Sequence, residues 1–397
     1  MRVDLQLVTS GQSHGPGIVA VLSGMPAGLV VDRERMQRDL ARRQAGYGRS
    51  PRQKIEQDTA EILGGMRHGT TLGGPISLIV ANRDHANWGA AMSAWAVTQE
   101  ELEAVATRRW RKVNVPRPGH ADLSGVLKYE LDDVRNVLER ASARETCARV
   151  AAGAIAKDLL TLLDIEVLGH VIRVGDVASD PRPDLTAADF ARRTDSQLEC
   201  LDPAVEEKML AAIDAAKRDQ DTLGGIIEVR IFGCPPGLGS YTEPRLRLDA
   251  RLGAAALAIQ AMKGVEIGDG FANAALRGSQ VHDELGYDDA SFRRRTNRAG
   301  GLEGGMSNGE PIVVRIAMKP LPTLMRPLRT ATIDTFQDAT ALVERSDTTA
   351  IAAAAVVAEA VLAFEIARCV CEKFGGDSVG DLRAAHRAYL ARIPWMP

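Results

Sequence analysis

The sequence predicts an α+β protein, a β-α-β sandwich of two mixed antiparallel sheets with helices between them and an internal pseudo-twofold repeat. Three landmarks support this fold class, because each occurs in both halves of the chain and in the same order. They are a strand that runs into a G-x-P-x-G-L turn, a helix that follows it, and a Gly-Gly-Met turn before a second strand. Each landmark alone is common in unrelated proteins, but three in order favour a duplication over chance.

The first landmark is a matched pair of strands. Residues 17–22 run into the turn at 24–29, and residues 225–230 run into the turn at 233–238. Glycine lets the backbone turn and proline fixes its direction, so each strand is expected to end there.

The second landmark is a helix after each turn. The spacing predicts helices over residues 32–44 and 249–262. Both begin at an aspartate, and Gly46 and Gly264 stand just beyond their ends, which is typical of helix boundaries.

The third landmark is a glycine-rich turn before a strand. Gly64-Gly65-Met66 precedes a strand predicted at 75–80, and Gly304-Gly305-Met306 precedes one at 311–318. Each half then closes on its longest helix, at about 132–163 and 348–374, the second ending at Gly375.

This pattern predicts the domain organisation. We expect a first half-repeat at 1–170, a connector at 171–221, and a second half-repeat at 222–397 that contains the C-terminal helix. The connector is acidic and proline-bearing at first and then helical near 203–217. The two halves are expected to form one compact catalytic domain with a cleft at their interface.

Composition excludes several classes of protein. The 397 residues are 45% hydrophobic and 25% charged, which is typical of a globular protein and not of a disordered or fibrous one. No secretory signal or membrane-spanning run is visible, and the five cysteines are scattered, so we expect a cytoplasmic protein with reduced thiols and no zinc. The net charge is −3, but basic stretches at 42–54, 108–117 and 140–149 favour a small anionic ligand.

Two histidines lie in loops that suit a binding site. His14 stands between glycines after the first predicted strand, where a ligand can approach closely. His120 follows Arg117 in a loop restricted by two prolines, which suits an anionic substrate. The alternatives are a turn in which the His14 ring only satisfies a backbone carbonyl, and a turn in which Asp122 caps the following helix.

Further cations and glycines are candidates for ligand contacts. Arg140 and Arg144 have the four-residue spacing of one helix face, although such a face is more often solvated. The glycine-rich segment 296–309 matches neither a P-loop nor a dinucleotide fingerprint, yet its amides can hold an anion. Asp347 lies before the last helix, where an ordinary N-cap is the alternative interpretation. No set of His, Asp and Glu has metal-ligand spacing.

Seven segments together resemble the chorismate synthase family. They occur in the family's order and extend over nearly the entire chain: 11–15, 42–49, 116–122, 140–145, 263–270, 299–309 and 344–347. The sequence departs from the commonest family pattern at Gln12, usually glutamate, and within 348–352, where the family often has a cysteine and a proline. We expect these departures to adjust the properties of the active site and not to abolish its activity.

The resemblance assigns roles to individual residues. It implies that His14 and His120 are acid–base histidines and that Asp347 is the acidic partner near a flavin. Arg43 and Arg49 match positions associated with binding of NADPH or a phosphate-bearing ligand. It implies FMN contacts at Arg140, Ala141, Ser142, Gln260, Ala261, Gly304, Lys319, Pro320, Leu321, Pro322, Thr323 and Arg345.

The implied reaction is the last step of the shikimate pathway, which serves aromatic amino-acid biosynthesis. A lyase removes phosphate from 5-enolpyruvylshikimate 3-phosphate by 1,4-anti elimination and forms chorismate with no net redox change. Reduced FMN lends electron density while the C–O bond breaks. His14 protonates the leaving phosphate, His120 keeps the flavin protonated, and Asp347 assists proton removal.

The resemblance also implies a homotetramer that acts on a small molecule, without nucleic acid or membrane. NADPH is one source of reducing equivalents, and a separate flavin reductase is favoured because no large fungal-type insertion is evident. Two other classes compete with this interpretation. An RNA or polyphosphate binder would show basic residues interleaved with aromatics, and aromatics are only 4% of this chain. A flavin enzyme that transfers hydride is the other, and the motifs do not favour it.

Overall fold

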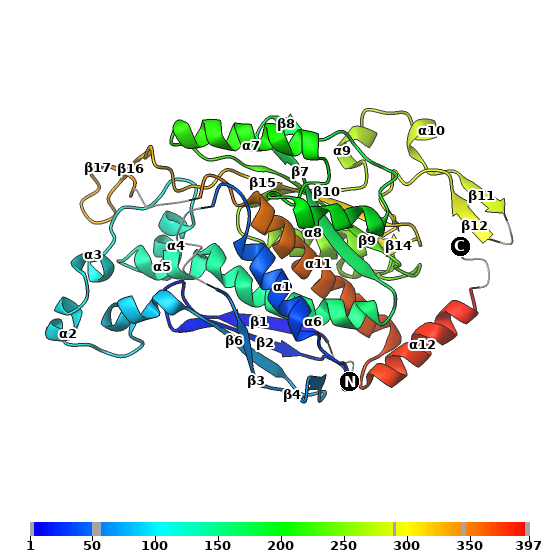
Figure 1. The fold of residues 1–397 in the computed structure, drawn as a ribbon, viewed down its shortest axis with the longest axis horizontal. Helices are drawn as coiled ribbons and strands as arrows, with labels where there is room; N and C mark the ends of the chain where they lie inside the picture. Colours follow the sequence, from blue (N-terminus) through cyan, green and yellow to red (C-terminus); the bar gives the residue numbers. More distant parts are fainter. Residues whose placement is uncertain (1–3, 50–56, 289–290, 343–346, 394–397) are drawn as a thin grey trace.

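The computed structural model describes residues 4–49, 57–288, 291–342 and 347–393 and has two main sheets (Figure 1). The first sheet contains β1 (Gln6–Ser10), β2 (Gly17–Ser23), β3 (Ala60–Gly64) and β6 (Ile76–Ala81) in the order β1-β2-β6-β3. All its neighbouring strands are antiparallel. β1 is an edge strand, and the loop 11–16 joins it to β2.

The second sheet is also antiparallel throughout. It contains β7 (Glu166–Val174), β8 (Val177–Ala178), β9 (Gly225–Phe232), β10 (Met262–Ile267) and β15 (Ile312–Met318) in the order β10-β15-β9-β7-β8. Short hairpins complete the strands: β4 (Met66–Arg67) with β5 (Thr70–Thr71), β11 (Leu285–Asp288) with β12 (Ser291–Arg294), β13 (Leu302–Glu303) with β14 (Met306–Ser307), and β16 (Arg329–Ala331) with β17 (Asp338–Thr340).

Four helices lie between the two sheets (Figure 1). α6 (Thr146–Thr161) packs against β2 and β6, α11 (Ile351–Phe374) packs against β7 and β9, and the two helices pack against each other. α1 (Arg33–Gln44) and α8 (Leu248–Leu257) complete this layer. The facing sides of α6 and α11 are largely alanine and buried, so their backbones approach closely. Small side chains therefore set the spacing of the layer.

The remaining helices are short or peripheral. They are α2 (Gln99–Glu103), α3 (Thr107–Trp110), α4 (Asp122–Tyr129), α5 (Arg135–Ala141), α7 (Pro203–Arg218), α9 (Gly270–Asn273), α10 (Gly278–Val281) and α12 (Val379–Ala391). None of the helices in the described part of the chain has the length and hydropathy of a membrane span. All five cysteines are buried and unpaired.

The strands and turns of the three landmarks are confirmed. The predicted strands at 17–22, 225–230, 75–80 and 311–318 lie in β2, β9, β6 and β15. Gly28 and Gly237, the matched turn glycines, have φ of +87° and +82°, a conformation that favours glycine. The mixed α/β architecture with antiparallel sheets therefore agrees with the sequence.

Two predicted helices differ from the structure. The helix expected at 249–262 ends at Leu257, because Ala261 takes a left-handed φ of +68° and Met262 begins β10. The helix expected at 132–163 is broken at Ser142, whose ψ of 140° is extended. The Ser142 hydroxyl accepts from Arg144 N and caps the next turn. Arg140 and Arg144 therefore do not share one helix face.

β7 crosses the position where the first half was expected to end. It spans residue 170 and pairs with β9 in the second sheet. The helix expected near 203–217 is α7, which begins after Asp202, whose side chain accepts from Ala204 N and Val205 N. The helix expected at 348–374 is α11, which begins three residues later, at Ile351, and ends before Gly375 as predicted. It is followed by α12, so it is not the last helix of the chain.

The crossing of α6 and α11 yields a stability prediction. A Cβ added at Gly153 on α6 would lie 2.5 Å from the Cβ of Ala360 and 2.7 Å from its Cα. Gly153→Ala should therefore lower the free energy of unfolding by about 1–3 kcal/mol through overpacking. Gly253 on α8 has open space around it, so Gly253→Ala should raise stability by up to about 1 kcal/mol. Urea unfolding compares the two, and equal effects would contradict the packing argument.

Candidate active site

His14 is held by a buried carboxylate. It lies in the loop between β1 and β2, and its Nδ1 lies 2.8 Å from Glu139 Oε1 on α5. The other Glu139 oxygen accepts from the His14 backbone N at 2.9 Å. Trp88 stacks on the imidazole with ring centroids 4.0 Å apart. The ring does more than satisfy a backbone carbonyl, the alternative considered from the sequence.

A polar network fixes the loop around His14. Asn82, at the end of β6, donates through Nδ2 to the carbonyls of Gln12 (3.0 Å) and Gly15 (2.8 Å). Arg144 Nε donates to Asn82 Oδ1 at 2.8 Å, and Arg144 also binds the buried Asp58. The loop conformation thus depends on residues from three segments distant in sequence.

Arg43 belongs to the same network. Its guanidinium is buried and donates to Asp58 (3.1 Å), to Thr146 Oγ1 (2.9 Å) and to the Ala143 carbonyl (3.0 Å). These contacts join α1 to the break between α5 and α6. Arg43 therefore supports the site by holding these segments together.

His120 has a carboxylate partner of its own. Its Nδ1 lies 2.5 Å from Asp122 Oδ1, and Arg117 Nε donates to Asp122 Oδ2 at 2.9 Å. Burial raises the pKa of Asp122, but hydrogen bonds from His120 and Arg117 outweigh it and hold the pKa at about 2. Asp122 is the first residue of α4 and makes no capping bond, so the capping interpretation is wrong.

The segment 319–323 packs against the His120 loop. Lys319 Nζ donates to the Gly119 carbonyl, and Arg117 Nη1 lies 3.4 Å from Thr323 Oγ1. Lys319 N donates to the Ala261 carbonyl at 3.0 Å. Pro320, Leu321 and Pro322 complete this segment, which links the His120 loop to the turn between α8 and β10.

Gln260 extends the link to the His14 side. Its Nε2 donates to Glu145 Oε2 (3.1 Å), and the other Glu145 oxygen accepts from Thr9 Oγ1 (2.6 Å). Arg140 donates to the Thr9 carbonyl at 2.9 Å. Ser142, just after Ala141 at the end of α5, bonds Ser13 Oγ through its hydroxyl at 3.2 Å. A continuous series of contacts therefore joins the two histidine loops.

Arg49 and Asp347 form an ion pair in which the Arg49 Nε makes no hydrogen bond in the described structure. This Nε is buried and lies 3.3 Å from Asp347 Oδ2. Burial lowers the pKa of Arg49, while Asp347 opposes the shift. The N-cap position of α11 is Ala350, so the interpretation of Asp347 as its N-cap is wrong.

One of the predicted flavin residues, Gly304, is not brought to this region. Gly304 lies in the β13–β14 turn, where the next carbonyl, of Gly305, accepts from Leu248 N at the start of α8 (2.8 Å). Gln260 and Ala261 follow the other end of α8, about 15 Å away for a ten-residue helix. Arg345 lies outside the described residues.

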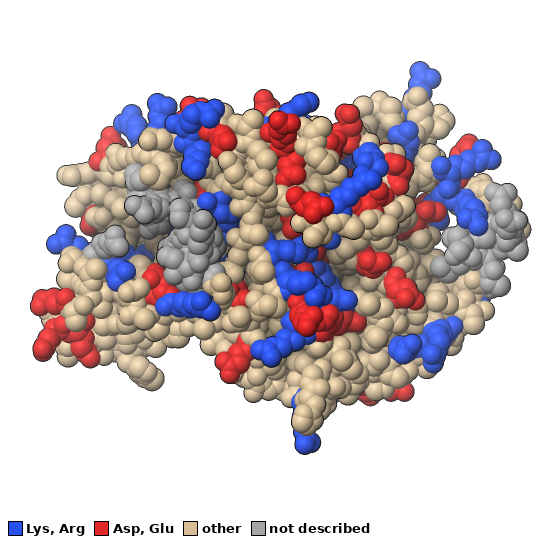
Figure 2. Space-filling model, viewed as in Figure 1, with Lys and Arg blue, Asp and Glu red and all other residues tan. Residues whose placement is uncertain are grey.

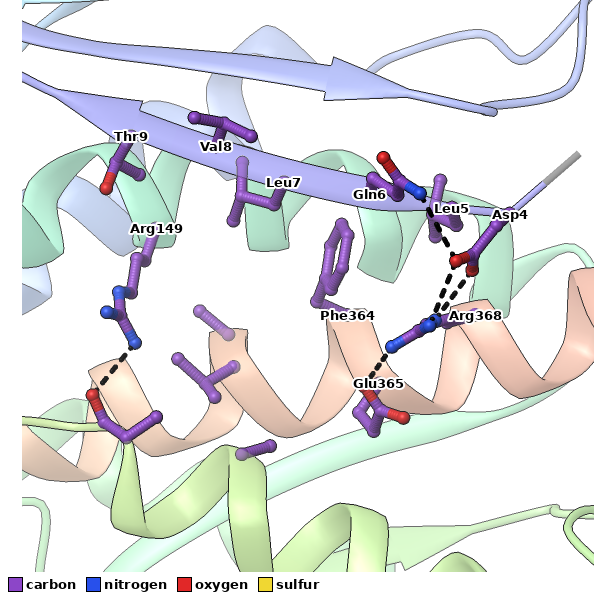
Figure 3. Close-up of a pocket in the computed structure, with 14 residues that line it drawn as sticks. Asp4, Leu5, Gln6, Leu7, Val8, Thr9, Arg149, Phe364, Glu365 and Arg368 are labelled. Atoms are coloured by element: carbon purple, nitrogen blue, oxygen red, sulfur yellow. Dashed lines mark hydrogen bonds and ion pairs between the residues drawn. The ribbon is translucent and has the colours of Figure 1, made fainter. Parts of the chain in front are cut away.

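A groove borders the site between β1 and α11 (Figure 3). Arg149 lies at one end and the Asp4–Arg368 ion pair (2.8 Å) at the other, with Phe364 between them. The Arg149 end adjoins the site, because Arg149 also donates to Glu145 at 2.9 Å. The described residues contain no group of three or more His, Cys, Asp and Glu able to hold a metal.

The charges on one face of the molecule do not favour a polyanion. On the face seen in Figure 2, lysine and arginine side chains alternate with aspartate and glutamate and do not form a continuous basic stripe. The cations of the candidate site face carboxylates and loop carbonyls instead. This arrangement suits a small anion and proton transfer by two imidazoles.

Comparison with known proteins decides the family. The family model described as chorismate synthase matches residues 5–371. The chain belongs to the chorismate synthase family. Chorismate synthases from Symbiobacterium thermophilum and Nocardia farcinica are 53% and 50% identical to it, over 98% and 100% of this chain and 99% and 98% of theirs. A crystal structure of chorismate synthase covers 98% of both chains, with 37% identity and a TM-score of 0.77.

The resemblance predicted from the motifs is thereby confirmed. Chorismate synthases are carbon–oxygen lyases that require reduced FMN and complete the shikimate pathway, so the predicted reaction is that of the family. In this chorismate synthase family member, sequence reasoning missed Glu139, Asp58 and Asn82. Glu139 directly precedes the motif segment 140–145, whereas Asp58 and Asn82 lie outside all seven segments and carry no local signal.

Proposed function

We propose that the chain converts 5-enolpyruvylshikimate 3-phosphate to chorismate, with His14, His120 and Asp347 as its acid–base residues. The observation that carries this assignment is the unbroken series of contacts from the His14 loop to the His120 loop. It passes through residues of α5, the α8–β10 turn and the segment 319–323. Two histidines, each on its own carboxylate, thus border one region rich in cations.

The residues of this region fit an anionic, flat cofactor. Gln260 Oε1 and Arg49 Nε are buried and lack hydrogen-bond partners in the described structure, so each has capacity for a ligand. Arg140 and Lys319 supply positive charge. FMN would be held by these segments, namely Arg140, Ala141, Ser142, Gln260, Ala261, Lys319, Pro320, Leu321, Pro322 and Thr323, with Gly304 and Arg345 as further proposed contacts. When bound in its reduced form, FMN supplies electron density to the breaking C–O bond.

The protein's own groups handle protons and charge. His14, whose Nδ1 lies 2.8 Å from Glu139 Oε1, donates a proton to the departing phosphate. His120, fixed by Asp122, keeps the neighbouring cofactor protonated. Asp347 assists removal of the ring proton. Arg49 binds the phosphate of the substrate or of NADPH, and Arg43 holds Asp58 beneath it.

The assembly and supply of reductant follow from the same assignment. The protein is a cytoplasmic homotetramer. Because Gly304 lies far from the other flavin residues within one chain, an assembly that supplies this loop from a second copy would account for its proposed contact. Reducing equivalents come from a separate flavin reductase, or from NADPH bound near Arg49.

The two halves are products of one duplication and form a single catalytic domain. The order β1-β2-β6-β3 in the first sheet corresponds to β7-β9-β15-β10 in the second. α1 and α6 correspond to α8 and α11 in chain order. This correspondence supports the pseudo-twofold sandwich and groups β7 with the second half, so that the connector is an insertion between β7 and β9.

An anaerobic assay tests the proposed function. Purified protein, chemically reduced FMN and 5-enolpyruvylshikimate 3-phosphate should yield chorismate absorbance and free phosphate in equal amounts. The same mixture with oxidised FMN should give neither. Flavin binding by the folded protein without turnover would overturn the proposal and direct attention to Gln12 and to residues 348–352.

A further inference from the structure

We propose that Asn82, His85 and Trp88 act together as positioning residues for His14, and we call them the 82–88 platform. The inference rests on the proposed function for its consequence in catalysis, because His14 is the proposed acid of that reaction. It is supported by the spacing of the three residues, by their contacts with the His14 loop, and by the groups that hold them in place. None of the three belongs to the segments that resemble the family.

The spacing of three places the platform residues on one side of a short helix. Residues Arg83–Asn87 form a 3₁₀ helix with Asn82 as its N-cap and Trp88 as its C-cap. A 3₁₀ helix has three residues per turn, so positions 82, 85 and 88 lie above one another. Ala81, just before this helix, pairs with Gly17 at the start of β2. The helix therefore lies beside the loop that joins β1 to β2.

Asn82 holds both ends of the turn that contains His14. Its Nδ2 donates to the carbonyls of Gln12 (3.0 Å) and Gly15 (2.8 Å), and its backbone N donates to the Pro16 carbonyl (3.1 Å). Asn82 is only 5% exposed, so water has little access to replace these bonds. Carbonyls only accept hydrogen bonds, so the amide must turn its NH₂ group toward the loop.

The direction of the Asn82 amide is set from its other side. Arg144 Nε donates to Asn82 Oδ1 at 2.8 Å, and Arg144 also binds Asp58, whose side chain is fully buried. A guanidinium only donates, so the amide cannot turn over without setting its NH₂ group against Arg144. An aspartate at this position would still accept from Arg144 but would repel the two loop carbonyls. Asparagine therefore suits a site between a cation and two carbonyls.

His85 and Trp88 act on His14 itself. His85 Nδ1 lies 3.0 Å from the His14 carbonyl and must donate to it, because a carbonyl only accepts. The Trp88 ring stacks on the imidazole with centroids 4.0 Å apart and an interplanar angle of 26°. Trp88 Nε1 donates to Asp84 Oδ2 at 3.0 Å, and Arg135 Cζ lies 5.3 Å from the ring centroid. The indole is therefore held by groups other than His14, and one segment fixes both the backbone and the ring of His14.

The contact between Trp88 and His14 supplies a readout that needs neither cofactor nor turnover. An imidazole in van der Waals contact quenches indole emission, so His14→Ala should raise the tryptophan emission of the protein without ligands. Trp88→Phe should abolish this rise, which assigns it to the stacked pair. In the Asn82→Asp background, His14→Ala should raise the emission by less than about half as much as in the parent, because the loop no longer holds the two rings together.

Turnover should change in a way that depends on His14. Asn82→Asp should lower kcat with reduced FMN by about 10–100-fold and leave KM within about threefold, because misplacement of a reacting group by about 1 Å can cost 10²-fold. In the His14→Ala background, adding Asn82→Asp should lower the residual rate by less than about twofold, because the amide acts through His14.

A matched control and a second variant complete the test. Asn136 is an exposed asparagine on α5, so Asn136→Asp makes the same substitution away from the platform and should leave emission and turnover unchanged. His85→Phe removes the bond to the His14 carbonyl and leaves the Asn82 amide in place. It should lower kcat by about three- to tenfold, the size expected for one hydrogen bond, and reduce the emission rise. It carries the test alone if Asn82→Asp does not fold.

The outcomes distinguish this inference from the proposed function. An emission rise on His14→Ala that is as large in the platform variants as in the parent would overturn the inference. An equal loss of rate with and without His14 would overturn it as well. A parent protein that shows the expected emission rise but makes no chorismate would instead overturn the proposed function.

Discussion

Replacing His14 with alanine should lower kcat for chorismate formation by about 10²–10⁴-fold while the protein still folds and binds FMN. The size follows from the usual contribution of a positioned acid–base side chain. The hydrogen bonds of Asn82 and Asp58 do not involve the His14 side chain. Its removal therefore leaves this buried network intact. Steady-state kinetics with reduced FMN measures the loss.

A matched histidine provides the control. His282 is exposed and lies outside the site, so His282→Ala should turn over substrate as the parent does. His120→Ala should lose activity as His14→Ala does, because its imidazole is fixed by Asp122 in the same manner. A His14→Ala enzyme within tenfold of the parent would show that the phosphate leaves without help from this imidazole.

Local sequence signals predicted the strands well and the helix boundaries less well. The strand-like runs followed by G-x-P-x-G-L turns predicted β2 and β9, because these features depend on a few neighbouring residues. The break at Ser142 and the left-handed Ala261 carry no such signal. Alanine, the residue at 261, is the best helix former, so its conformation results from tertiary contacts, including the Lys319 N bond to its carbonyl.

The candidate site shows the same division. Motif residues such as His14 and His120 were visible in the sequence because glycines and prolines surround them. Their carboxylate partners were not equally visible. Asp122 is close to His120 but looks like a helix cap, and Glu139 is 125 residues from His14. Long-range pairs form only when the fold brings β1 and α5 together, and no spacing rule within one sequence encodes that approach.

The buried charge network at Glu359 determines how firmly the helix layer is held together. Glu359 lies on α11 with 1% exposure and accepts hydrogen bonds from Lys157 Nζ (2.8 Å) and Gly169 N (2.8 Å). Two arginines, Arg42 (3.0 and 3.1 Å) and Arg193, also bind it. These partners come from α1, α6, β7 and the segment that follows β8, so one carboxylate joins four parts of the chain.

Glu359→Gln should lower the free energy of unfolding by about 3–5 kcal/mol, because three partly buried cations would lose the buried anion that they share. Burial raises the pKa of Glu359, but the charges of Arg42, Lys157 and Arg193 outweigh it and hold the pKa well below its usual 4.5. A carboxyl with a depressed folded-state pKa stabilises the fold above its unfolded-state pKa, and this stabilisation is lost as the pH falls further.

The difference between parent and Glu359→Gln should therefore be largest near neutral pH and shrink as the pH falls below about 4.5. Urea unfolding at pH 7 and at lower pH values measures it. Glu303, 45% exposed and paired with Arg294, is the matched control, and Glu303→Gln should change stability by less than about 1 kcal/mol. A loss at Glu359 as small as that at Glu303 would mean that the three cations find water or other acceptors once the charge is gone. In that case the helix layer would be held by its alanine packing and not by this carboxylate.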